Sequence, residues 1–408
     1  MNIDESPMSW KALEALVIPD IDRVNGPTNA QATIRLFGHS EKDVRVTLYR
    51  DHHAWCPYCQ KVWLWLEFKQ IPYEIRKVTM RCYGRKEDWF LQKVPSGMLP
   101  ALELDKQLIT ESDIILLALE RSFGNLGMAL ESPRARELRH LERLLFKSWC
   151  QWLCRRRLNQ RQEDQAKATF QRFAWLLEQA LNADQTSPWL GNDALPGGID
   201  LVFIPYVERM NASLAYYKGF RLRQEHPAIN RWLSALETLS TYQGTQSDFH
   251  THVHDLPPQM GGCWKASNND EQIRIEQLID CGDGLESDEC CWPNFNSIQQ
   301  SQLALSRVLR HRQRLMEINP LGPSDFDQPL RCALTRLVKG NDCKPNKGSA
   351  SALRYLRDRI SVPRDMPLPA ARLLRQALEA TASLDGSAVP APLLVSNRYD
   401  QDPEPFIT

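Results

Sequence analysis

The chain has 408 residues, which is enough for two or three domains of ordinary size. Its 50 basic and 50 acidic side chains balance, so charge does not favour a nucleic-acid partner. No apolar run reaches the roughly 18 residues that a membrane helix needs, and the N-terminus lacks a signal-peptide pattern. Eleven cysteines, an odd number spread along the chain, favour a reducing, cytoplasmic setting over a secreted disulfide framework.

The first elements of the chain surround a pair of cysteines. Residues 1–43 have no strong periodicity, and we expect them to form an N-terminal arm. A strand is predicted over 44–49, and apolar side chains at helical spacing predict a helix over 60–68. Between the strand and the helix stands a Cys-Pro-Tyr-Cys motif that begins at Cys56.

This motif suits thiol chemistry. Cys56 is expected at the helix N-terminus, where free N–H groups and the helix dipole favour an anion. That environment lowers a thiol pKa, and the thiolate is the form that attacks disulfides and electrophiles. Pro57 suits the first helical turn, because its missing N–H would have no helical partner there. Cys59, one turn later, can reach back and resolve a mixed disulfide on Cys56.

Two other interpretations of the motif stay open. A Cys-x-x-Cys motif can form half of a zinc site; no second one occurs, but His52 and His53 could complete the ligands. Both cysteines could instead be inert core residues, because free cysteine is often buried. The strand before the motif and the helix after it favour redox or nucleophilic chemistry.

Further elements complete the first domain, which we place at residues 44–124. In chain order we predict a strand over 72–78, a short helix or turn over 87–93, a loop over 94–104 that becomes a strand after Pro100, a turn at 105–106, a strand over 107–109, and a helix opened by residues 110–113 that Gly124 stops.

Three motifs of this segment together resemble a known family. They are the Cys56 motif, the Pro-x-Gly-x-x-Pro run from Pro95 to Pro100, and Glu111-Ser112 at a helix start. The segment resembles the thioredoxin-fold N-terminal domain of the cytosolic glutathione transferases, nearest to the cysteine-type, omega-like classes. Those classes usually keep only the first cysteine, so the glutaredoxin-type motif of this chain favours thiol–disulfide exchange.

The resemblance implies a glutathione site. Pro100 would be the cis-proline of the fold, and Leu99 would offer its main-chain N–H and C=O to the cysteinyl part of glutathione. Ser112 would hold the γ-glutamyl carboxylate, with Glu111 pairing the amino group. Lys86 matches a basic residue that meets the glycyl carboxylate. Ser112 could otherwise be a plain helix N-cap, and Lys86 a solvated surface lysine.

Beyond the linker at 125–132 the pattern becomes helical. The predicted fold class is α+β, with four parts in chain order after the arm: the thioredoxin-fold domain over 44–124, an all-helical domain over 133–244 that resembles the C-terminal domain of the same family, a mainly helical extension over 245–385, and a flexible tail over 386–408.

The extension has no counterpart in ordinary members of the family. If extended, His250, His252 and His254 would share one face and could bind a metal with Cys263, although we expect no metal. Residues 265–295 are polar and acidic and predict a long loop. The extension contains no second catalytic pattern, so we expect its helices to pack on the first two domains.

The leading functional hypothesis is a glutathione-dependent enzyme that transfers thiols or reduces disulfides or dehydroascorbate through a mixed disulfide on Cys56. One alternative is conjugation of glutathione to electrophiles, and another is a non-catalytic protein that binds glutathione or a partner. The expected partners are glutathione and a small electrophile or disulfide, without nucleic acid or membrane. The resemblance leaves room for a homodimer.

Overall fold

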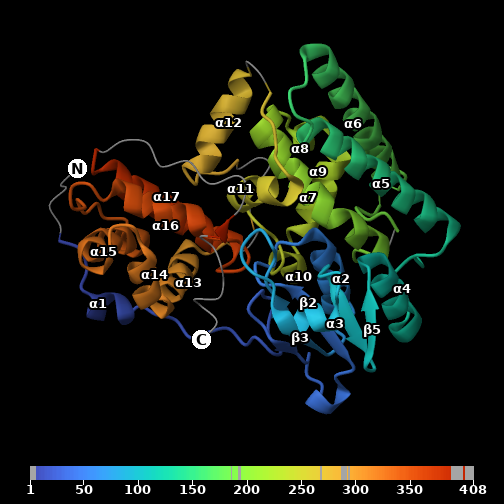
Figure 1. Cartoon of the computed structure of the whole chain (residues 1–408), viewed down its shortest axis with the longest axis horizontal. Helices are drawn as coiled ribbons and strands as arrows, with labels where there is room; N and C mark the ends of the chain where they lie inside the picture. The colour runs from blue at the N-terminus through green and yellow to red at the C-terminus, as the bar shows by residue number, and fades with distance from the viewer. Residues whose placement is uncertain are drawn as a thin grey trace.

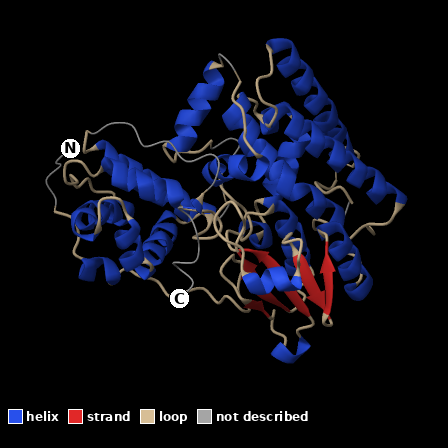
Figure 2. Ribbon diagram, viewed as in Figure 1, coloured by secondary structure: helices blue, strands red, loops and turns tan. Residues whose placement is uncertain are grey.

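The protein is a mixed sheet with helices around it and a separate helical lobe beside it (Figure 1). It is a computed structural model that describes residues 6–184, 186–191, 194–266, 269–285, 292, 295–386 and 398–399. The expected α+β class is confirmed, because the strands belong to one sheet near the N-terminus and the rest is mainly helical (Figure 2). None of the described helices has the length and apolar character needed to cross a membrane.

The sheet has five strands in the order β1-β3-β2-β4-β5. Their bounds are β1 Ile34–Arg35, β2 Val46–Asp51, β3 Tyr73–Val78, β4 Ala101–Leu104 and β5 Gln107–Thr110. Only β2 and β3 run parallel, because a helix connects them, whereas the other neighbours are antiparallel. This mixed sheet is the thioredoxin fold that the sequence predicts.

Helices cover both faces of the sheet. Helices α2 (Pro57–Phe68) and α4 (Ser112–Phe123) cover one face, where Leu48 belongs to the main core. Helix α3 (Asp88–Lys93) covers the other face, where Tyr49 packs with Phe90 in a small cluster. Neighbouring residues of β2 thus point into different cores, as the period of two in a strand requires.

A long helical region follows and shares the main core with α2. Its helices are α5 Pro133–Leu153, α6 Gln160–Leu181, α7 Gly198–Lys218, α8 Leu222–Glu225, α9 Pro227–Leu236, α10 Ser240–Gln243, α11 Phe249–Met260 and α12 Asp270–Asp280. Helix α7 is central and buried along its whole length. It begins at Gly197, whose N–H donates to the Asp200 carboxylate at 2.9 Å, so glycine at the cap does not prevent a capping interaction.

The helical lobe has a hydrophobic core of its own. Its helices are α13 Ser297–Arg310, α14 Arg312–Ile318, α15 Pro323–Lys339, α16 Ala350–Arg359 and α17 Leu368–Ser383. Helix α1 (Trp10–Glu14) of the N-terminal arm joins this lobe, with Leu13 fully buried in its core. Trp10 Nε1 also donates to Asp327 at 2.7 Å, so the two ends of the chain stabilise each other.

Several elements differ from the sequence predictions. The arm contributes β1, which pairs with β3, and α1; both are too short to produce a periodic signal. The three-histidine segment is helix α11, which begins where the Asp248 side chain accepts the Thr251 N–H at 2.9 Å. The predicted loop 265–295 contains α12, whose apolar residues are few and spaced for one buried face. The division into domains stays a prediction.

The predicted flexible tail over 386–408 lies outside the described residues, apart from Gly386, Arg398 and Tyr399. Arg398 is buried, and its Nη1 donates to Asp255 at 2.8 Å. A small stub between two undescribed stretches therefore contacts α11.

Candidate active site

Two strand ends bring the cysteine motif to one edge of the sheet. Asp51 is the last residue of β2, and five residues later Cys56 is the N-cap of α2. The main-chain N–H of Gln60 donates to the Cys56 carbonyl at 3.0 Å, which closes the first helical turn. Pro57 occupies the first position of the helix, as expected. Cys56 therefore lies where the helix presents its free N–H groups.

The β4–β5 hairpin ends at the same edge. Ala101, the first residue of β4, pairs with Tyr49 near the end of β2, which places Pro100 beside the cysteine loop. Ala101 also pairs with Thr110, the last residue of β5, so the chain enters α4 at Ser112 from the same edge. The antiparallel register thus gathers the motifs that the sequence singled out, although they are far apart in the chain.

The two thiols of the motif contact each other. Cys56 is 7% exposed and Cys59 is 1% exposed. Burial raises the pKa of Cys59 well above its usual range, and a hydrogen bond with Cys56 adds to this effect. Cys59 is consequently a protonated thiol that cannot replace Cys56 as the first nucleophile.

Asp51 is a residue of this site that the sequence analysis missed. Its fully buried side chain accepts the Trp55 N–H at 2.6 Å and the Cys56 N–H at 3.1 Å, both through Oδ2. Oδ1 has no hydrogen-bond partner among the described residues. One carboxylate oxygen and the sulfur atoms of Cys56 and Cys59 all lie within 4.8 Å of one another. An acidic residue five positions before the motif was the available signal.

The zinc alternative that the sequence left open needed His52 and His53, and both lie elsewhere. The buried His53 ring stacks on Tyr83, with 3.5 Å between ring centroids. His52 Nε2 faces Glu87 at 3.6 Å. Among the described residues, the third group that could share a metal with the two thiols is Asp51.

Lys86 is not a solvated surface lysine. It is 7% exposed, and burial lowers the pKa of its ammonium group, while the charges of Cys59, Glu87 and Cys56 act in the opposite direction. The ammonium lies 5.5 Å from the Phe90 ring centroid, and no carboxylate of the described chain is within ion-pair distance. A buried cation close to two thiols favours a negative charge there, whether on a thiolate or on a ligand.

The peptide bond between Leu99 and Pro100 is cis, as expected from the sequence. Pro100 is buried, whereas Leu99 is half-buried. Within the described chain, neither the N–H nor the C=O of Leu99 takes part in a hydrogen bond. These two groups stand just before β4, where an extended ligand could pair with them as an added strand does.

Ser112 is the first residue of α4, and the N-cap is Glu111. Neither side chain caps the helix, which argues against the plain N-cap interpretation of Ser112. Ser112 is buried, and its hydroxyl makes no hydrogen bond to another described residue. Glu111 is exposed and has a φ of 65°, in the left-handed region that side chains other than glycine rarely adopt. Such outliers often occur at ligand sites.

Sequence comparison identifies the segment that holds these residues. The sequence model of the glutathione S-transferase N-terminal domain matches residues 55–122. That match runs from the residue before Cys56 through the cis-proline to the end of α4. We call this matched segment, residues 55–122, the transferase domain.

Similarity to individual proteins covers about half of the chain. Glutathione S-transferase DHAR3, chloroplastic, of Arabidopsis thaliana is 22% identical over 211 residues, which cover 51% of this chain and 75% of that protein. Glutathione S-transferase L3 of the same plant is 25% identical over 194 residues, 47% of this chain and 79% of that protein. The crystal structure of Chlamydomonas reinhardtii dehydroascorbate reductase covers 50% of this chain and 93% of that chain, with 21% identity and a TM-score of 0.42.

Helix α11 extends the site of the transferase domain from outside it. Trp55 Nε1 donates to His252 Nδ1 at 3.2 Å, and His252 Nε2 contacts Glu208 at 2.9 Å. Because Nδ1 accepts a hydrogen bond from Trp55, the ring proton of His252 is on Nε2, which faces Glu208. Burial lowers the pKa of His252, which favours this neutral form. Arg209 lies 4.7 Å from the Trp55 ring centroid and donates to the Trp55 carbonyl. The residue before Cys56 is therefore held by α7 and α11.

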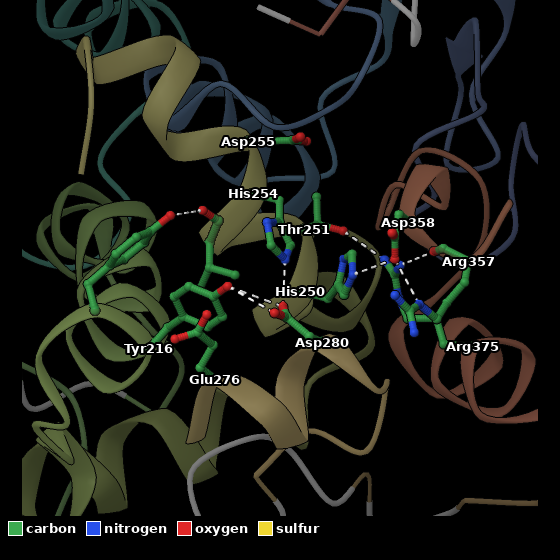
Figure 3. A network of polar contacts seen from close by, with 12 residues as sticks. Tyr216, His250, Thr251, His254, Asp255, Glu276, Asp280, Arg357, Asp358 and Arg375 are labelled. Carbon is green, nitrogen blue, oxygen red and sulfur yellow. Dashed lines mark hydrogen bonds and ion pairs between the residues drawn. The ribbon is translucent and has the colours of Figure 1, made fainter. Parts of the chain in front are cut away.

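The other two histidines face away from the transferase domain (Figure 3). His250 and His254 lie one turn apart on α11, and their donor atoms and that of Asp280 are within 4.8 Å of one another. His254 Nε2 contacts Asp280 at 2.8 Å, and His250 Nε2 lies 3.5 Å from Asp358. Cys263 does not belong to this group.

This cluster is a polar network that joins four helices, α11, α12, α16 and α17. Arg375 lies beside His250 and, together with burial, lowers the pKa of that imidazole. Arg357 donates to the Asp358 carboxylate at 2.7 Å (Figure 3). These two guanidinium groups oppose a further positive charge, and a metal would have to displace the contact between His254 and Asp280. The network fixes α11 against α12 and α16.

Proposed function

We propose that the protein is a glutathione-dependent thiol–disulfide oxidoreductase that acts through a mixed disulfide on Cys56. The observation that carries this proposal is the position of Cys56 as N-cap of α2, at the sheet edge where the cis Leu99–Pro100 bond and Ser112 also lie. The description of the matched family supports glutathione as the co-substrate. The open main-chain groups of Leu99 suit its cysteinyl part.

Two further residues suit the charged ends of glutathione. The Ser112 hydroxyl and the start of α4 are arranged for the γ-glutamyl carboxylate, with the exposed Glu111 available for the amino group. Lys86 supplies a buried positive charge close to the thiols. This charge can therefore stabilise either a thiolate on Cys56 or the glycyl carboxylate of glutathione.

The first step uses Cys56 alone. Its thiolate attacks the glutathionyl sulfur of a mixed disulfide, so a bond forms between Cys56 Sγ and that sulfur while the substrate leaves as a thiol. The thiolate of a second glutathione then attacks the bound glutathionyl sulfur. This second exchange yields glutathione disulfide and restores the Cys56 thiolate. With dehydroascorbate, two glutathione thiols supply the two electrons and two protons that convert the substrate to ascorbate, and the two glutathione molecules end as glutathione disulfide through the same mixed disulfide on Cys56.

A second route uses Cys59. Its thiol loses a proton, attacks Cys56 Sγ and releases glutathione, which leaves a disulfide between the two cysteines. Because burial raises the pKa of Cys59, this attack requires a proton acceptor. One oxygen of the Asp51 carboxylate lies within 4.8 Å of both sulfur atoms, and Oδ1 has no hydrogen-bond partner among the described residues. We assign Asp51 that role.

The test compares three activities of the intact protein. Mass spectrometry after treatment with glutathione disulfide should find one glutathione on Cys56, and the protein should reduce dehydroascorbate with glutathione. Conjugation of glutathione to chlorodinitrobenzene should be weak. Strong conjugation without a Cys56 adduct would favour the transferase alternative, and binding without either activity would favour a non-catalytic role. The cytoplasmic location and the omega-like type also remain proposals.

A further inference from the structure

A cavity of about 270 Å³ lies at the seam between the transferase domain and the helical lobe. The sheet side contributes His52, from the turn after β2, and Lys77, from β3. The rest of the wall comes from α13, α14, α16, α17 and the segment before α17, which Figure 1 draws beside the sheet. The volume is that of roughly nine water molecules in the liquid. The helical lobe therefore builds most of this cavity.

The cavity has an apolar body. Seven of its sixteen lining residues are aliphatic or methionine, among them Val308, Leu315 and Leu374 from three different helices. Tyr355 adds an aromatic ring. A wall of this kind is typical of sites that hold the apolar part of a small molecule.

The charged part of the lining is strongly one-sided. Three arginines and one lysine line the cavity against a single acidic residue, Asp365. The Asp365 carboxylate already pairs with Arg364 at 2.7 Å. Arg307 donates from Nε to the main-chain carbonyl of Asp365 at 2.8 Å, not to a carboxylate. Among the described residues that line the cavity, positive charges thus outnumber negative ones in a partly apolar space.

Lys77 is the clearest case of a positive charge in the cavity without an acidic partner in the described chain. It is half-buried, and its ammonium has neither a hydrogen bond nor an ion pair with another described residue. Burial lowers the pKa of Lys77 to about 7, and nearby arginines add to this effect. These arginines are Arg50, Arg23 and Arg307. Placing the positive charge of Lys77 beside other positive charges in a buried site is unfavourable in free energy, and an anionic ligand would offset that penalty.

We propose that this cavity binds a small amphipathic organic anion, whose carboxylate or phosphate head contacts Lys77 and Arg307 and whose apolar part lies between α13, α14 and α17. The site is distinct from the cysteine edge and does not depend on the proposed thiol chemistry. Its nearest connection to that edge is His52, four residues before Cys56.

Binding should be coupled to a proton. Above pH 7 the free protein holds Lys77 mostly neutral, so an anion that restores its charge takes up a proton from solution. Below pH 7 the lysine is already charged, and the uptake disappears. The other titratable or charged groups around the cavity are His52 with its neighbour Glu87, His311, Arg359, Arg364 and Asp365.

The first test is calorimetric titration of the full chain, without glutathione, with four ligands of the same chain length. Octanoate and octyl phosphate carry the two anionic heads, octanol is neutral, and octylamine is cationic. We expect at least one anion to bind at least about tenfold more tightly than octanol, or about 1.4 kcal/mol. Octylamine should not bind. Equal binding of octanol and both anions would overturn the proposal, because an apolar cavity alone would explain it.

Matched variants locate the binding. Lys77→Met keeps the length of the side chain and removes an uncompensated charge, so the protein should fold at least as well and lose at least about tenfold in anion affinity. Arg307→Met should also weaken binding, whereas Lys42→Met, at an exposed site outside the cavity, should not. Unchanged affinity in both Lys77→Met and Arg307→Met would place the anion elsewhere. Titration in buffers of different ionisation enthalpy should detect proton uptake above pH 7 in the wild type only.

Discussion

The Asp51 carboxylate accepts the main-chain N–H of Cys56 at 3.1 Å, so the last residue of β2 holds the N-cap residue of α2 in place. The same oxygen accepts the Trp55 N–H, whereas Oδ1 has no hydrogen-bond partner among the described residues. Asp51 thus has two separable effects. One oxygen shapes the loop, and the other is available for proton transfer to or from Cys59.

Asp51→Asn separates these effects. The amide oxygen can still accept both N–H groups, but the side chain can no longer take a proton. We expect release of glutathione from glutathionylated Cys56, without added glutathione, to slow by about 100-fold or more. Formation of the adduct should change little. Asp164→Asn, on the exposed face of α6, is the control. Faster release in Asp51→Asn would mean that Asp51 acts only by raising the pKa of Cys59 with its charge.

Replacing each cysteine should separate the two routes. Cys56→Ser should abolish thiol transfer, since Cys56 alone occupies the N-terminus of α2. Cys59→Ser should retain the fraction of activity that glutathione supports. Both are measured as glutathione-dependent reduction of a mixed disulfide, with Cys281→Ser as the control. Equal loss in Cys56→Ser and Cys59→Ser would contradict the monothiol route, and an active Cys56→Ser protein would remove the assignment.

Ser112→Ala should weaken glutathione binding but not the fold. Glutathione should raise the melting temperature of the wild type, because it binds the native state only. The variant should lose roughly 1.5–3 kcal/mol of binding through a missing charge-assisted hydrogen bond. Ser132, the N-cap of α5, accepts the Ala135 N–H and is a matched control. Ser132→Ala should lower basal stability by about 1 kcal/mol and keep the glutathione shift. The reverse pattern would make Ser112 a structural residue.

Glu87 should make the protein sensitive to acid. Burial raises the pKa of the Glu87 carboxyl, but hydrogen bonds from His52 and Thr79 outweigh it and lower the pKa to about 2, from the usual 4.5. Because the folded-state pKa is depressed, the stabilisation is present above about pH 4.5 and is lost as the pH falls toward 2. Glu87→Gln should therefore be less stable than the wild type at neutral pH, by up to about 3 kcal/mol.

The measurement is urea unfolding of wild type and Glu87→Gln at several pH values. The difference in the free energy of unfolding should shrink as the pH falls below 4.5. Glu41→Gln, at an exposed site, should show no such trend. A difference that stays constant with pH would mean that the carboxylate charge of Glu87 does not matter for stability.

The parts of the site that the sequence predicted are those written in local patterns. The position of Cys56 between a strand and a helix follows from motif and periodicity, whereas Pro100 and Ser112 were expected at the site from the resemblance to the glutathione transferases. The sequence analysis missed the role of Asp51 because a buried acidic residue at the end of a strand produces no recognisable sequence pattern. The burial of Lys86 escaped as well, since its neighbours in sequence are polar and favour an exposed position.

The features that the sequence did not predict depend on contacts between distant segments. The hydrogen bond between Trp55 and His252 joins residues 197 positions apart, and α1 packs into a lobe that begins near residue 297. Periodicity describes one element at a time, so it cannot tell which surface an element covers. Helix α12 is a related case, because its buried Gln272 donates to the Tyr216 carbonyl and reads as a loop residue in the sequence.

Truncations test how the extension supports the first two domains. A chain that ends at Gly244 loses α11, and the buried Glu208 carboxylate then loses both His252 and the Ser247 N–H, which donates at 2.8 Å. The Gln60 amide still donates to this carboxylate at 2.9 Å, but a buried charged group that loses two of its hydrogen-bond partners costs roughly 1–3 kcal/mol or more. We therefore expect this chain to be insoluble or to melt well below the wild type.

A chain that ends at Leu285 keeps α11 and α12 on the main core and removes only the helical lobe. It loses the buried pair of Asp248 and Arg375, so it should be less stable than the full chain but more stable than the chain ending at Gly244. Cys56 should still become glutathionylated, because its contacts with Asp51 and the Trp55–His252 contact remain. Melting temperatures and mass spectrometry measure both effects. Equal stability of the two truncated chains would mean that α11 does not support the site. Loss of glutathionylation in a folded chain ending at Leu285 would instead mean that the helical lobe takes a direct part in the chemistry.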